Sequence, residues 1–506
     1  MSTTTTGASV EPAADSSVPD VRWAPLLAVS GAFAAVLLVF AGGYGYYLDE
    51  LYFRVAGEHL AWGYVDQPPL VAVLAKLQVL LFGDGLTAIR VVPALLAGAS
   101  VLVAGLIARE FGGGAVAQVL AACASAASLA TVAAGHVLHP TAVDHLVWVA
   151  VCWLVVRLLR TGDQRLWIAI GAVVGVGMLA KYLVVLLVLG LAAGLLVGGP
   201  RKVFASPHLA LGAGLALVLN LPGLVWQGLN GWPQLAMAGS LSEQPGVGAA
   251  VNLLVGQVLM VGPLLTPVWV VGLVALVRRP AWRTYRVLAW THLVVFVVVA
   301  AVGGYARYTA GLLVVLLSAG CVVVTTWASG GVKRTLVALA VVGNAAFAAV
   351  VVLPVLPVES YAGDDVLGAL GAGQLEQTGW PRVADQVADV HRSLPPADRA
   401  AAIVYGHNYS EAGAIDRYGP ERGLPRAYSG QNSYADFGTP TDDKTVVIAF
   451  GVDRAAFSAL FGSCESRGTF TFDLPQPEQG KEILVCRGLR EPWSATWPRL
   501  RWLGTF

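Results

Sequence analysis

Six ionisable side chains stand close together directly after the first long apolar run of the sequence. A carboxyl group at the mouth of an apolar helix can face a partly desolvated cavity, where burial raises its pKa and makes it a better general base near neutral pH. We expect one member of the Asp49–Glu50 pair to face such a cavity and the other to take a structural partner. The alternative is a pair of solvated acids at a helix end. The six residues, in YLDELYFRVAGEHLAWGYVDQPPL, are Asp49, Glu50, Arg54, Glu58, His59 and Asp66.

A second candidate constellation surrounds Pro140, in HVLHPTAVDHLVWVA at residues 136–150. His139 precedes an expected outward turn, and Asp144 and His145 begin the next apolar segment, where ionisable side chains are expensive to bury and more often functional. Histidine and carboxylate side chains can bind a metal together, so a metal site is an alternative, but no third ligand lies at a suitable spacing. We therefore expect no metal site in this motif. No cofactor is expected beyond a lipid-linked sugar donor as co-substrate, and whether the protein requires a metal stays open.

Basic side chains next to tyrosines form the third candidate. Lys181 ends the run GAVVGVGMLAKY, and Arg307 and Tyr308 lie in YARY at residues 305–308. Arginine and lysine can hold the oxygens of a phosphate group through charge-assisted hydrogen bonds. Together with Arg90, these residues suggest that an anion is bound at one membrane surface. The alternative is that each cation reaches the lipid headgroups or pairs with a nearby acid.

Long apolar segments must position these side chains. The chain has 506 residues, of which 56% are hydrophobic and 12% charged, and the formal net charge of +1 gives no sign of nucleic-acid binding. Apolar runs near the roughly 20 residues that cross a bilayer predict a polytopic α-helical membrane protein with about eleven transmembrane helices. The pair at 166–180 and 182–198 is short and can also be one broken helix. The expected spans are 24–43, 86–108, 115–134, 138–158, 166–180, 182–198, 208–225, 250–277, 287–303, 308–328 and 335–354.

The distribution of Lys and Arg between the loops sets the expected orientation. With a cytoplasmic N-terminus, most loop cations fall on the cytoplasmic side, as the positive-inside rule requires. The opposite face receives only Arg54, Lys76, Arg90, Lys181 and Arg307 before the polar C-terminal part. We expect a disordered cytoplasmic tail at 1–22 and a transmembrane domain at 23–354. Its first external loop, at 44–85, carries the candidate base, and a small extracytoplasmic α/β domain follows at 355–506.

Two cysteines lie in the polar C-terminal part. Apparent strands near 401–405, 444–450, 467–473 and 482–486, with helical patterns near 409–418 and 453–461, predict the α/β domain. Cys464 and Cys486 can form a disulfide in an oxidising compartment, and two buried thiols are the alternative.

An ordered series of motifs resembles a known family. The series is YLDELYFRVAGEHLAWGYVDQPPL, HPTAVD, GVGMLAKY, NLPGLVWQGLNGWP and GQVLMVGPLLTPVW. It is similar to the bacterial family 39 glycosyltransferases, the protein O-mannosyltransferase-like and aminoarabinose-transferase-like branch of the GT-C superfamily. The resemblance covers most of residues 24–360. It implies an enzyme of the cell membrane that takes a sugar from a polyprenyl-phosphate donor at the outer face, a hexosyl- or pentosyltransferase that inverts the sugar.

The resemblance also implies roles for individual residues. Asp49 matches the family's proposed catalytic base, with Glu50 as its neighbour, and Asp144 matches a second acidic position that orients a substrate. Lys181, Arg307 and Tyr308 fall in regions that contact the donor phosphate, and Arg90 is a further candidate for that contact. The family often has a Lys-Pro-Tyr-Tyr-like string where this chain has GYARYTAG, so either Arg307 substitutes for that lysine or the role is lost.

Weaker expectations concern the acceptor and the partners. His59, Asp66 and His139 are candidates to contact the acceptor or the sugar. The expected partners are the lipid-linked donor, membrane lipids and a glycan or protein acceptor. Two other classes stay open: a transporter or lipid flippase, against which the absence of an internal repeat speaks, and a noncatalytic envelope scaffold with the same fold.

Overall fold

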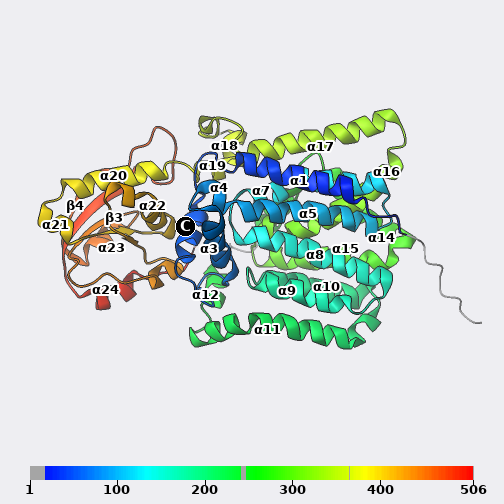
Figure 1. Cartoon of the computed structure of the whole chain (residues 1–506), viewed down its shortest axis with the longest axis horizontal. Coiled ribbons are helices and arrows are strands. Elements are labelled where there is room, and N and C mark those ends of the chain that lie inside the picture. Colours follow the sequence, from blue (N-terminus) through cyan, green and yellow to red (C-terminus); the bar gives the residue numbers. More distant parts are fainter. Residues whose placement is uncertain (1–17, 241–246, 364, 505–506) are drawn as a thin grey trace, which may run out of the picture.

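The computed structural model describes residues 18–240, 247–363 and 365–504, and it consists of a helical bundle with a smaller α/β domain at one end (Figure 1). Residues 1–17 of the tail expected at 1–22 lie outside the described residues. Within the described ranges, seven helices are long and apolar enough to cross a membrane, or up to nine if each of two bent pairs is one crossing. The polytopic helical class is confirmed. The predicted count of about eleven requires two shorter apolar helices as well, and it stays a prediction.

The bundle follows the apolar runs of the sequence closely. One bent pair is Ala115–Ala127 with Leu129–His136, at 61°, and the other is Gly248–Val261 with Thr266–Arg278, at 109°. The helices are α1 (Trp23–Phe40), α5 (Val91–Glu110), α6 (Ala115–Ala127), α7 (Leu129–His136), α8 (Pro140–Thr161), α9 (Leu166–Met178), α10 (Val184–Gly198), α11 (Pro207–Leu229), α12 (Pro233–Ser240), α13 (Val247–Val261), α14 (Thr266–Arg278), α15 (Arg286–Ala301), α16 (Ala310–Trp327) and α17 (Gly331–Val352).

Helices α9 and α10 form a hairpin, not one broken helix. The indole Nε1 of Trp167, in the first turn of α9, donates a hydrogen bond of 3.2 Å to the carbonyl oxygen of Val203, just beyond the end of α10. The start of α9 and the end of α10 therefore lie at the same end of the bundle. Lys181, in the connection between them, lies at the other end, where the backbone N–H of Leu70 donates to the carbonyl of Leu179.

Different charged side chains lie at the two ends of the bundle. At the end away from the α/β domain, Glu110 accepts hydrogen bonds from Arg109 and Arg160, at 3.1 and 2.5 Å. At the end next to the α/β domain lie Lys181 and Arg307, which share the ring of Tyr308. This separation agrees with the expected orientation, and which end faces the cytoplasm stays a prediction.

The loop between α1 and α5 is folded against the end of the bundle. It contains α2 (Leu48–Ala56), α3 (Leu70–Phe82) and the short α4 (Leu86–Ile89). Helix α3 begins directly after Pro69, and Figure 1 shows it lying across the bundle axis. Its Leu80 and Leu81 are exposed, as expected for a helix that lies in the membrane interface.

The α/β domain has a five-stranded sheet in the order β2-β1-β3-β5-β4, in which β1 is parallel to β2 and β3, and β5 is antiparallel to β3 and β4. Strands β1 and β3 are buried throughout, because helices cover both faces of the sheet. The elements are α18 (Val366–Leu370), α19 (Ala372–Leu375), α20 (Trp380–Ser393), α21 (Pro396–Ala400), β1 (Ala402–Gly406), α22 (Tyr409–Tyr418), β2 (Ala427–Tyr428), β3 (Val446–Phe450), α23 (Arg454–Ser458), β4 (Phe461–Thr469), β5 (Glu482–Leu489) and α24 (Trp493–Leu500).

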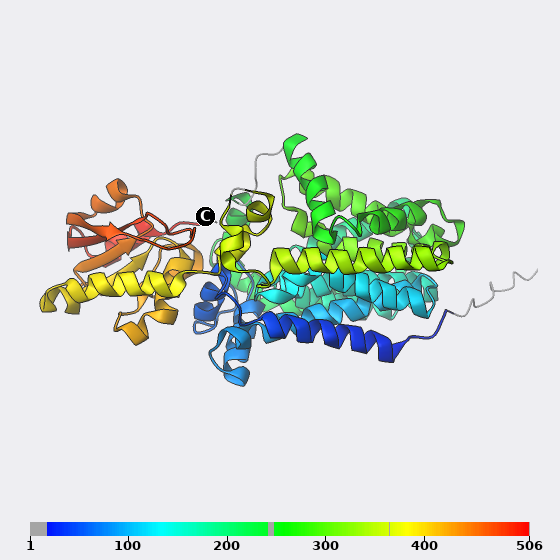
Figure 2. The same cartoon turned by 90° about the horizontal axis from the view of Figure 1, so that it is seen from above.

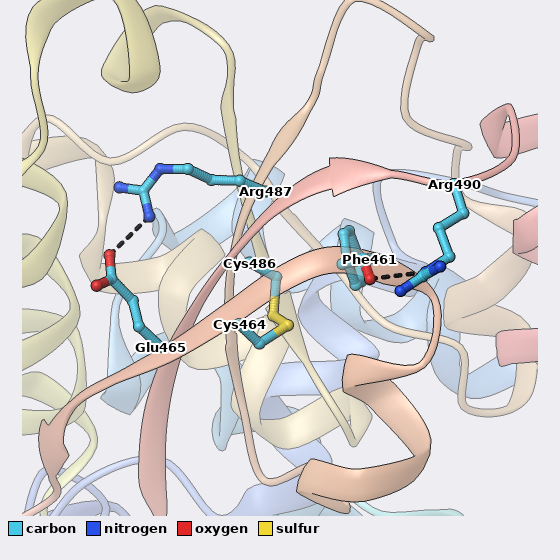
Figure 3. Close-up of a disulfide and its surroundings, with 6 residues drawn as sticks. All are labelled: Phe461, Cys464, Glu465, Cys486, Arg487 and Arg490. Carbon is cyan, nitrogen blue, oxygen red and sulfur yellow. Dashed lines mark hydrogen bonds and ion pairs between the residues drawn. A yellow bond between two sulfur atoms is a disulfide. The ribbon is translucent and has the colours of Figure 1, made fainter.

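A disulfide joins Cys464 of β4 to Cys486 of β5 (Figure 3). The two residues are direct partners in the antiparallel register, with Cα atoms 4.0 Å apart. Beside the disulfide, Arg487 Nη1 lies 2.6 Å from Glu465 Oε1, an ion pair that runs diagonally across the two strands, because Arg487 pairs with Ser463 and Glu465 with Val485. The disulfide therefore fixes an edge strand to the sheet. Cys123, Cys152 and Cys321 are unpaired and lie in the bundle.

The two parts of the chain meet at α2 and α22. A Cβ atom on Gly413 would lie 3.0 Å from Leu51, so the glycine permits close approach of the two helices. The rings of Tyr52 and Tyr409 stack with centroids 4.7 Å apart, and the backbone N–H of Val65 donates to Ser433 Oγ at 2.9 Å. The first external loop is thus held between the bundle and the α/β domain, as Figure 2 shows from above.

Candidate functional site

Asp49 lies in the first turn of α2, at the junction between the bundle and the α/β domain. The Tyr409 hydroxyl donates a hydrogen bond of 2.7 Å to its Oδ1. Burial raises the pKa of Asp49 to about 6, although the hydrogen bond from Tyr409 and the charge of Arg307 act in the opposite direction. A carboxylate with this pKa is ionised at neutral pH and can still accept a proton from a substrate hydroxyl.

The neighbouring carboxyl group has a different environment. Glu50 is fully buried and forms a bidentate ion pair with Arg90, at 3.0 and 2.7 Å. The backbone N–H groups of Tyr47 and Leu138 also donate to it, at 2.8 and 3.0 Å. Four hydrogen bonds leave Glu50 no accessible oxygen for a substrate, so we replace its expected catalytic role with a structural one.

Arg90 is fully buried as well. Besides Glu50, its guanidinium donates to the carbonyl oxygens of Ala41 and Gly45 and to Gln377 Oε1, at 2.9, 2.8 and 3.1 Å. The expected role of Arg90 in phosphate binding is therefore corrected, because its donors are engaged inside the protein. Arg90 instead connects the end of α1, the start of α2 and the segment that follows α19.

His139 faces the second oxygen of Asp49. Its Nε2 lies 3.5 Å from Asp49 Oδ2, while its Nδ1 accepts a hydrogen bond of 3.0 Å from the backbone N–H of Thr141. Burial and the charges of Lys181 and Arg307 lower the pKa of His139 well below its usual value. The neutral ring therefore carries its proton on Nε2, because Nδ1 is an acceptor. His139 orients the carboxylate without protonating it.

Lys181, Arg307 and Tyr308 lie together, as the sequence suggested. Lys181 Nζ is 4.7 Å from the centroid of the Tyr308 ring, and the Arg307 guanidinium is 4.1 Å from the ring of Tyr305 and 5.6 Å from that of Tyr308. Burial lowers the pKa of Lys181 to about 8, and the charges of Asp144 and Asp49 oppose this shift. The site therefore holds two cations, Lys181 and Arg307, beside two carboxyl groups, Asp49 and Asp144.

Asp144 is buried in the first turns of α8. Its Oδ1 accepts a hydrogen bond of 3.0 Å from Trp148 Nε1, one turn further along the helix. The charge of Asp144 supports the protonated form of Lys181, so the two side chains lie near each other. His145, the other residue of this motif, points elsewhere, with its Nε2 3.2 Å from Thr131 Oγ1.

A cavity of 360 Å³ lies beside Asp49. Asp49, His139 and Arg307 all line it, together with apolar side chains of α7, α13 and α17 and glutamines that follow α18. The cavity therefore places a base and a cation around a space that is partly apolar. Its lining residues are Tyr47, Asp49, Ala130, Ala133, Ala134, His136, Val137, His139, Thr141, Met260, Arg307, Ala310, Val351, Val352, Leu370, Gly373, Gln374 and Gln377.

Asp66 lies on the other side of the stacked tyrosines. Its Oδ1 accepts a hydrogen bond of 2.7 Å from the Tyr52 hydroxyl, and burial raises its pKa to about 7. Two carboxylates and two tyrosines thus form a continuous polar array at the junction. His59 lies outside this array, because its ring stacks on Phe437 and its Nε2 is 2.9 Å from Arg426 Nη2.

Among the described residues, no group of three or more His, Cys, Asp or Glu side chains is arranged to hold a metal ion. His139 pairs with Asp49, whereas the metal site considered from the sequence would have joined His139 to Asp144 or His145. The expectations of no metal site at residues 136–150 and of no cofactor stay predictions.

Tyr409 and Glu376 belong to the site but were not expected from the sequence. Tyr409 is the first residue of α22, after a capping box in which Asn408 and Glu411 exchange hydrogen bonds with backbone N–H groups. That pattern, visible in NYSEAG, predicts the start of the helix. It does not predict the contact between Tyr409 and Asp49. Burial raises the pKa of Glu376, and its charge in turn raises that of Asp49.

Comparison with known proteins agrees with the fold. Residues 66–226, about a third of the chain, match the model of the family described as dolichyl-phosphate-mannose-protein mannosyltransferase. The architecture has the fold of the GT-C glycosyltransferases, and the resemblance to this class is confirmed.

The structure is similar to ArnT from Cupriavidus metallidurans bound to undecaprenyl phosphate. The TM-score is 0.65 at 16% identity, over 91% of this chain and 97% of that one. It is also similar to the arabinofuranosyltransferase AftD from Mycobacteria, with a TM-score of 0.52 at 14% identity, over 94% of this chain but 40% of that one. The sequence matches none of the curated proteins.

Proposed function

We propose that the protein is a membrane glycosyltransferase that moves a sugar from a polyprenyl-phosphate-linked donor to a hydroxyl group of a cell-envelope acceptor. The observation that carries this proposal is the buried Asp49, with a pKa raised to about 6, which shares a cavity with Arg307. A base and a cation around one cavity suit the two charges that such a transfer must handle. The bound undecaprenyl phosphate of ArnT supports a lipid-linked phosphate donor.

In the proposed reaction, Asp49 removes the proton of the acceptor hydroxyl. Its Oδ1 is occupied by Tyr409, and its Oδ2 lies at the outer limit of a hydrogen bond from His139. Oδ2 therefore takes the substrate proton. The acceptor oxygen attacks the anomeric carbon from the face opposite the phosphate, and the carbon–oxygen bond to the phosphate breaks. This displacement inverts the sugar.

The leaving group is a phosphate on which charge accumulates as its bond breaks. Lys181 and Arg307 supply positive charge to that oxygen, and Tyr308 holds both cations through its ring. Asp144 positions Lys181. The donor reaches the cavity from the membrane, and the glycan or protein acceptor reaches it from the extracytoplasmic side, where the α/β domain lies in the proposed orientation.

Donor binding tests this function directly. We expect Lys181→Met and Arg307→Met each to weaken binding of decaprenyl-phosphate mannose or decaprenyl-phosphate arabinose about tenfold, because each removes a charge-assisted hydrogen bond to phosphate. Lys76→Met, which removes a cation on α3 that does not share the Tyr308 ring with Lys181 and Arg307, is the matched control. Equal affinity of all four proteins for both donors would contradict the proposal.

The alternative classes give different results in the cell. Deletion of a transferase leads to accumulation of its lipid-linked sugar and loss of one envelope glycan, which mass spectrometry detects. Deletion of a flippase leaves the lipid-linked sugar on the cytoplasmic face, and deletion of a scaffold leaves the amount of the lipid-linked sugar unchanged. Donor-dependent glycosylation in isolated membranes separates the enzyme from both.

A further inference from the structure

One buried amide of α17 joins both bent helix pairs of the bundle. Asn344 is 0% exposed, and its Nδ2 donates hydrogen bonds of 2.9 Å to two backbone carbonyl oxygens, those of Ala127 and Val261. Ala127 is the last residue of α6, and Val261 is the last residue of α13. Each of the two carbonyl groups therefore stands where a helix pair bends.

These two carbonyl oxygens need a donor from another part of the chain. The last carbonyl groups of a helix have no partner within that helix, and unpaired backbone groups are costly inside a membrane. Gly262, which follows Val261, has a φ of +103°, and a Cβ atom there would lie 2.2 Å from Asn344 Oδ1. The glycine therefore leaves the room that the Asn344 amide needs to reach both bends.

Asn344 also fixes the position of α17, which has little other burial. Among the 22 residues of α17, only Asn344 and Ala348 are buried, and Figure 1 shows the helix at the edge of the bundle. Leu339 and Val342 are 61% and 65% exposed, as expected for side chains that contact acyl chains. Segments that are far apart in the sequence thus meet at one side chain.

The segments that meet at Asn344 form an apolar wall of the cavity at Asp49. Met260 directly precedes Val261, whose carbonyl accepts from Asn344, and Val351 lies seven residues after Asn344, two turns further along the same helix face. The position of the wall therefore depends on Asn344, which does not itself line the cavity. The wall consists of Ala130, Ala133 and Ala134 of α7, Met260 of α13, and Val351 and Val352 of α17.

The polar side chains beside the cavity are held by other contacts. Asp49 accepts a hydrogen bond from Tyr409, and the Arg307 guanidinium lies against the rings of Tyr305 and Tyr308. None of these contacts involves Asn344. A change at Asn344 should therefore move the apolar wall and leave the phosphate-binding cations in place.

We propose that Asn344 is a positioning residue that sets the apolar wall against which the first isoprene units of the lipid-linked donor lie. The inference rests on the proposed function, in which Lys181 and Arg307 bind the donor phosphate. The hydrocarbon chain next to that phosphate has no hydrogen-bonding group, so it lies along α7, α13 and α17. Asn344 acts through these helices and does not touch the substrate.

Binding of two phosphate monoesters with different chains tests the proposal. Decaprenyl phosphate has the full polyprenyl chain, whereas butyl phosphate has no isoprene unit. We expect Asn344→Leu, which keeps the size of the side chain and removes both hydrogen bonds, to weaken binding of decaprenyl phosphate about three- to tenfold in detergent. Its affinity for butyl phosphate should not change. Asn344→Asp, which when protonated can donate to one of the two carbonyl groups, should show a smaller loss.

Asn220→Leu is the matched control. Asn220 of α11 is 1% exposed, and its Nδ2 also donates two hydrogen bonds of 2.9 Å, to the carbonyl oxygens of Gly175 and Ala216. None of these three residues lines the cavity at Asp49. The ratio of the affinities for decaprenyl phosphate and butyl phosphate should therefore keep its wild-type value in Asn220→Leu.

An unchanged affinity of Asn344→Leu for decaprenyl phosphate would overturn the proposal. Equal loss of both phosphates in Asn344→Leu and Asn344→Asp, or failure of both variants to fold, would also overturn it, because Asn344 would then only hold the fold together. Arg307→Met tests the proposed function separately and should weaken binding of both phosphates to the same extent. Unchanged binding of both by Arg307→Met would contradict the proposed phosphate site, whatever the result for Asn344.

Discussion

Two adjacent carboxyl groups of α2 differ in their hydrogen-bond partners and in their access to the cavity. Glu50 receives hydrogen bonds from Arg90 and two backbone N–H groups, whereas Asp49 receives one from Tyr409 and lines a cavity. Neighbouring residues of a helix point about 100° apart, so one can face a cavity while the other faces the protein. The sequence predicted this division of roles but did not specify the partner of Glu50, because Arg90 is forty residues away.

The buried base and the buried lysine predict a bell-shaped pH profile for kcat/KM. The rising limb follows ionisation of Asp49, whose pKa is raised to about 6, since only the carboxylate accepts the proton. The falling limb follows loss of the proton from Lys181, whose pKa is lowered to about 8, since the neutral amine no longer stabilises phosphate.

Lys181→Arg is the control for this profile. Arginine stays protonated throughout the range, so the falling limb should move beyond pH 9, while the rising limb stays in place. The kcat/KM for the donor, measured at donor concentrations below KM between about pH 5 and pH 9, reports the free enzyme and checks both limbs. A profile that is flat between pH 5 and pH 7 would contradict the assignment of Asp49.

At the scale of single elements, the apolar runs predicted where most helices begin and end, because length and hydropathy decide that in a membrane. They predicted α9 and α10 as two separate spans, which the hairpin confirms over the alternative of one broken helix. They did not predict the bends after Ala127 and Val261, since these depend on packing between distant segments. In the α/β domain the predicted strand at 467–473 was shifted, because β4 covers Phe461–Thr469. The helix expected at 453–461 is shorter, at Arg454–Ser458.

The Glu50–Arg90 ion pair fixes α2, so we expect a large loss of stability when this pair is broken. Arg90→Met leaves Glu50 buried without its cation, which should cost about 3–5 kcal/mol in the free energy of unfolding. Arg392→Met is the control, because its pair with Asp389 is exposed and contributes at most about 1 kcal/mol. Thermal unfolding in detergent measures both. Similar melting temperatures for the two variants would rule out a structural role for Arg90.

At the scale of the whole molecule, the site is complete only where the α/β domain meets the bundle. Tyr409 reaches Asp49 across 360 residues of sequence. The sequence predicted both parts, because composition changes sharply after residue 354. It could not predict their contact, since hydropathy and periodicity describe each segment alone.

Tyr409→Phe tests this contact between the two parts. The hydrogen bond from Tyr409 lowers the pKa of Asp49, so its loss should raise that pKa and move the rising limb of the pH profile toward higher pH. Tyr428→Phe, on β2 of the same domain, should leave the profile in place. An unchanged rising limb in Tyr409→Phe would show that the α/β domain does not tune the base.

Single-turnover transfer by Asp49→Asn is the most direct measurement of the central claim. The variant, with the lipid-linked donor already bound, should keep wild-type donor affinity, because the cations are untouched. Its transfer rate should fall about 10²- to 10⁴-fold, the usual contribution of a general base. Asp163→Asn, an exposed acid at the opposite end of the bundle, should transfer at the wild-type rate. Full-rate transfer by a folded, donor-bound Asp49→Asn protein would contradict the account.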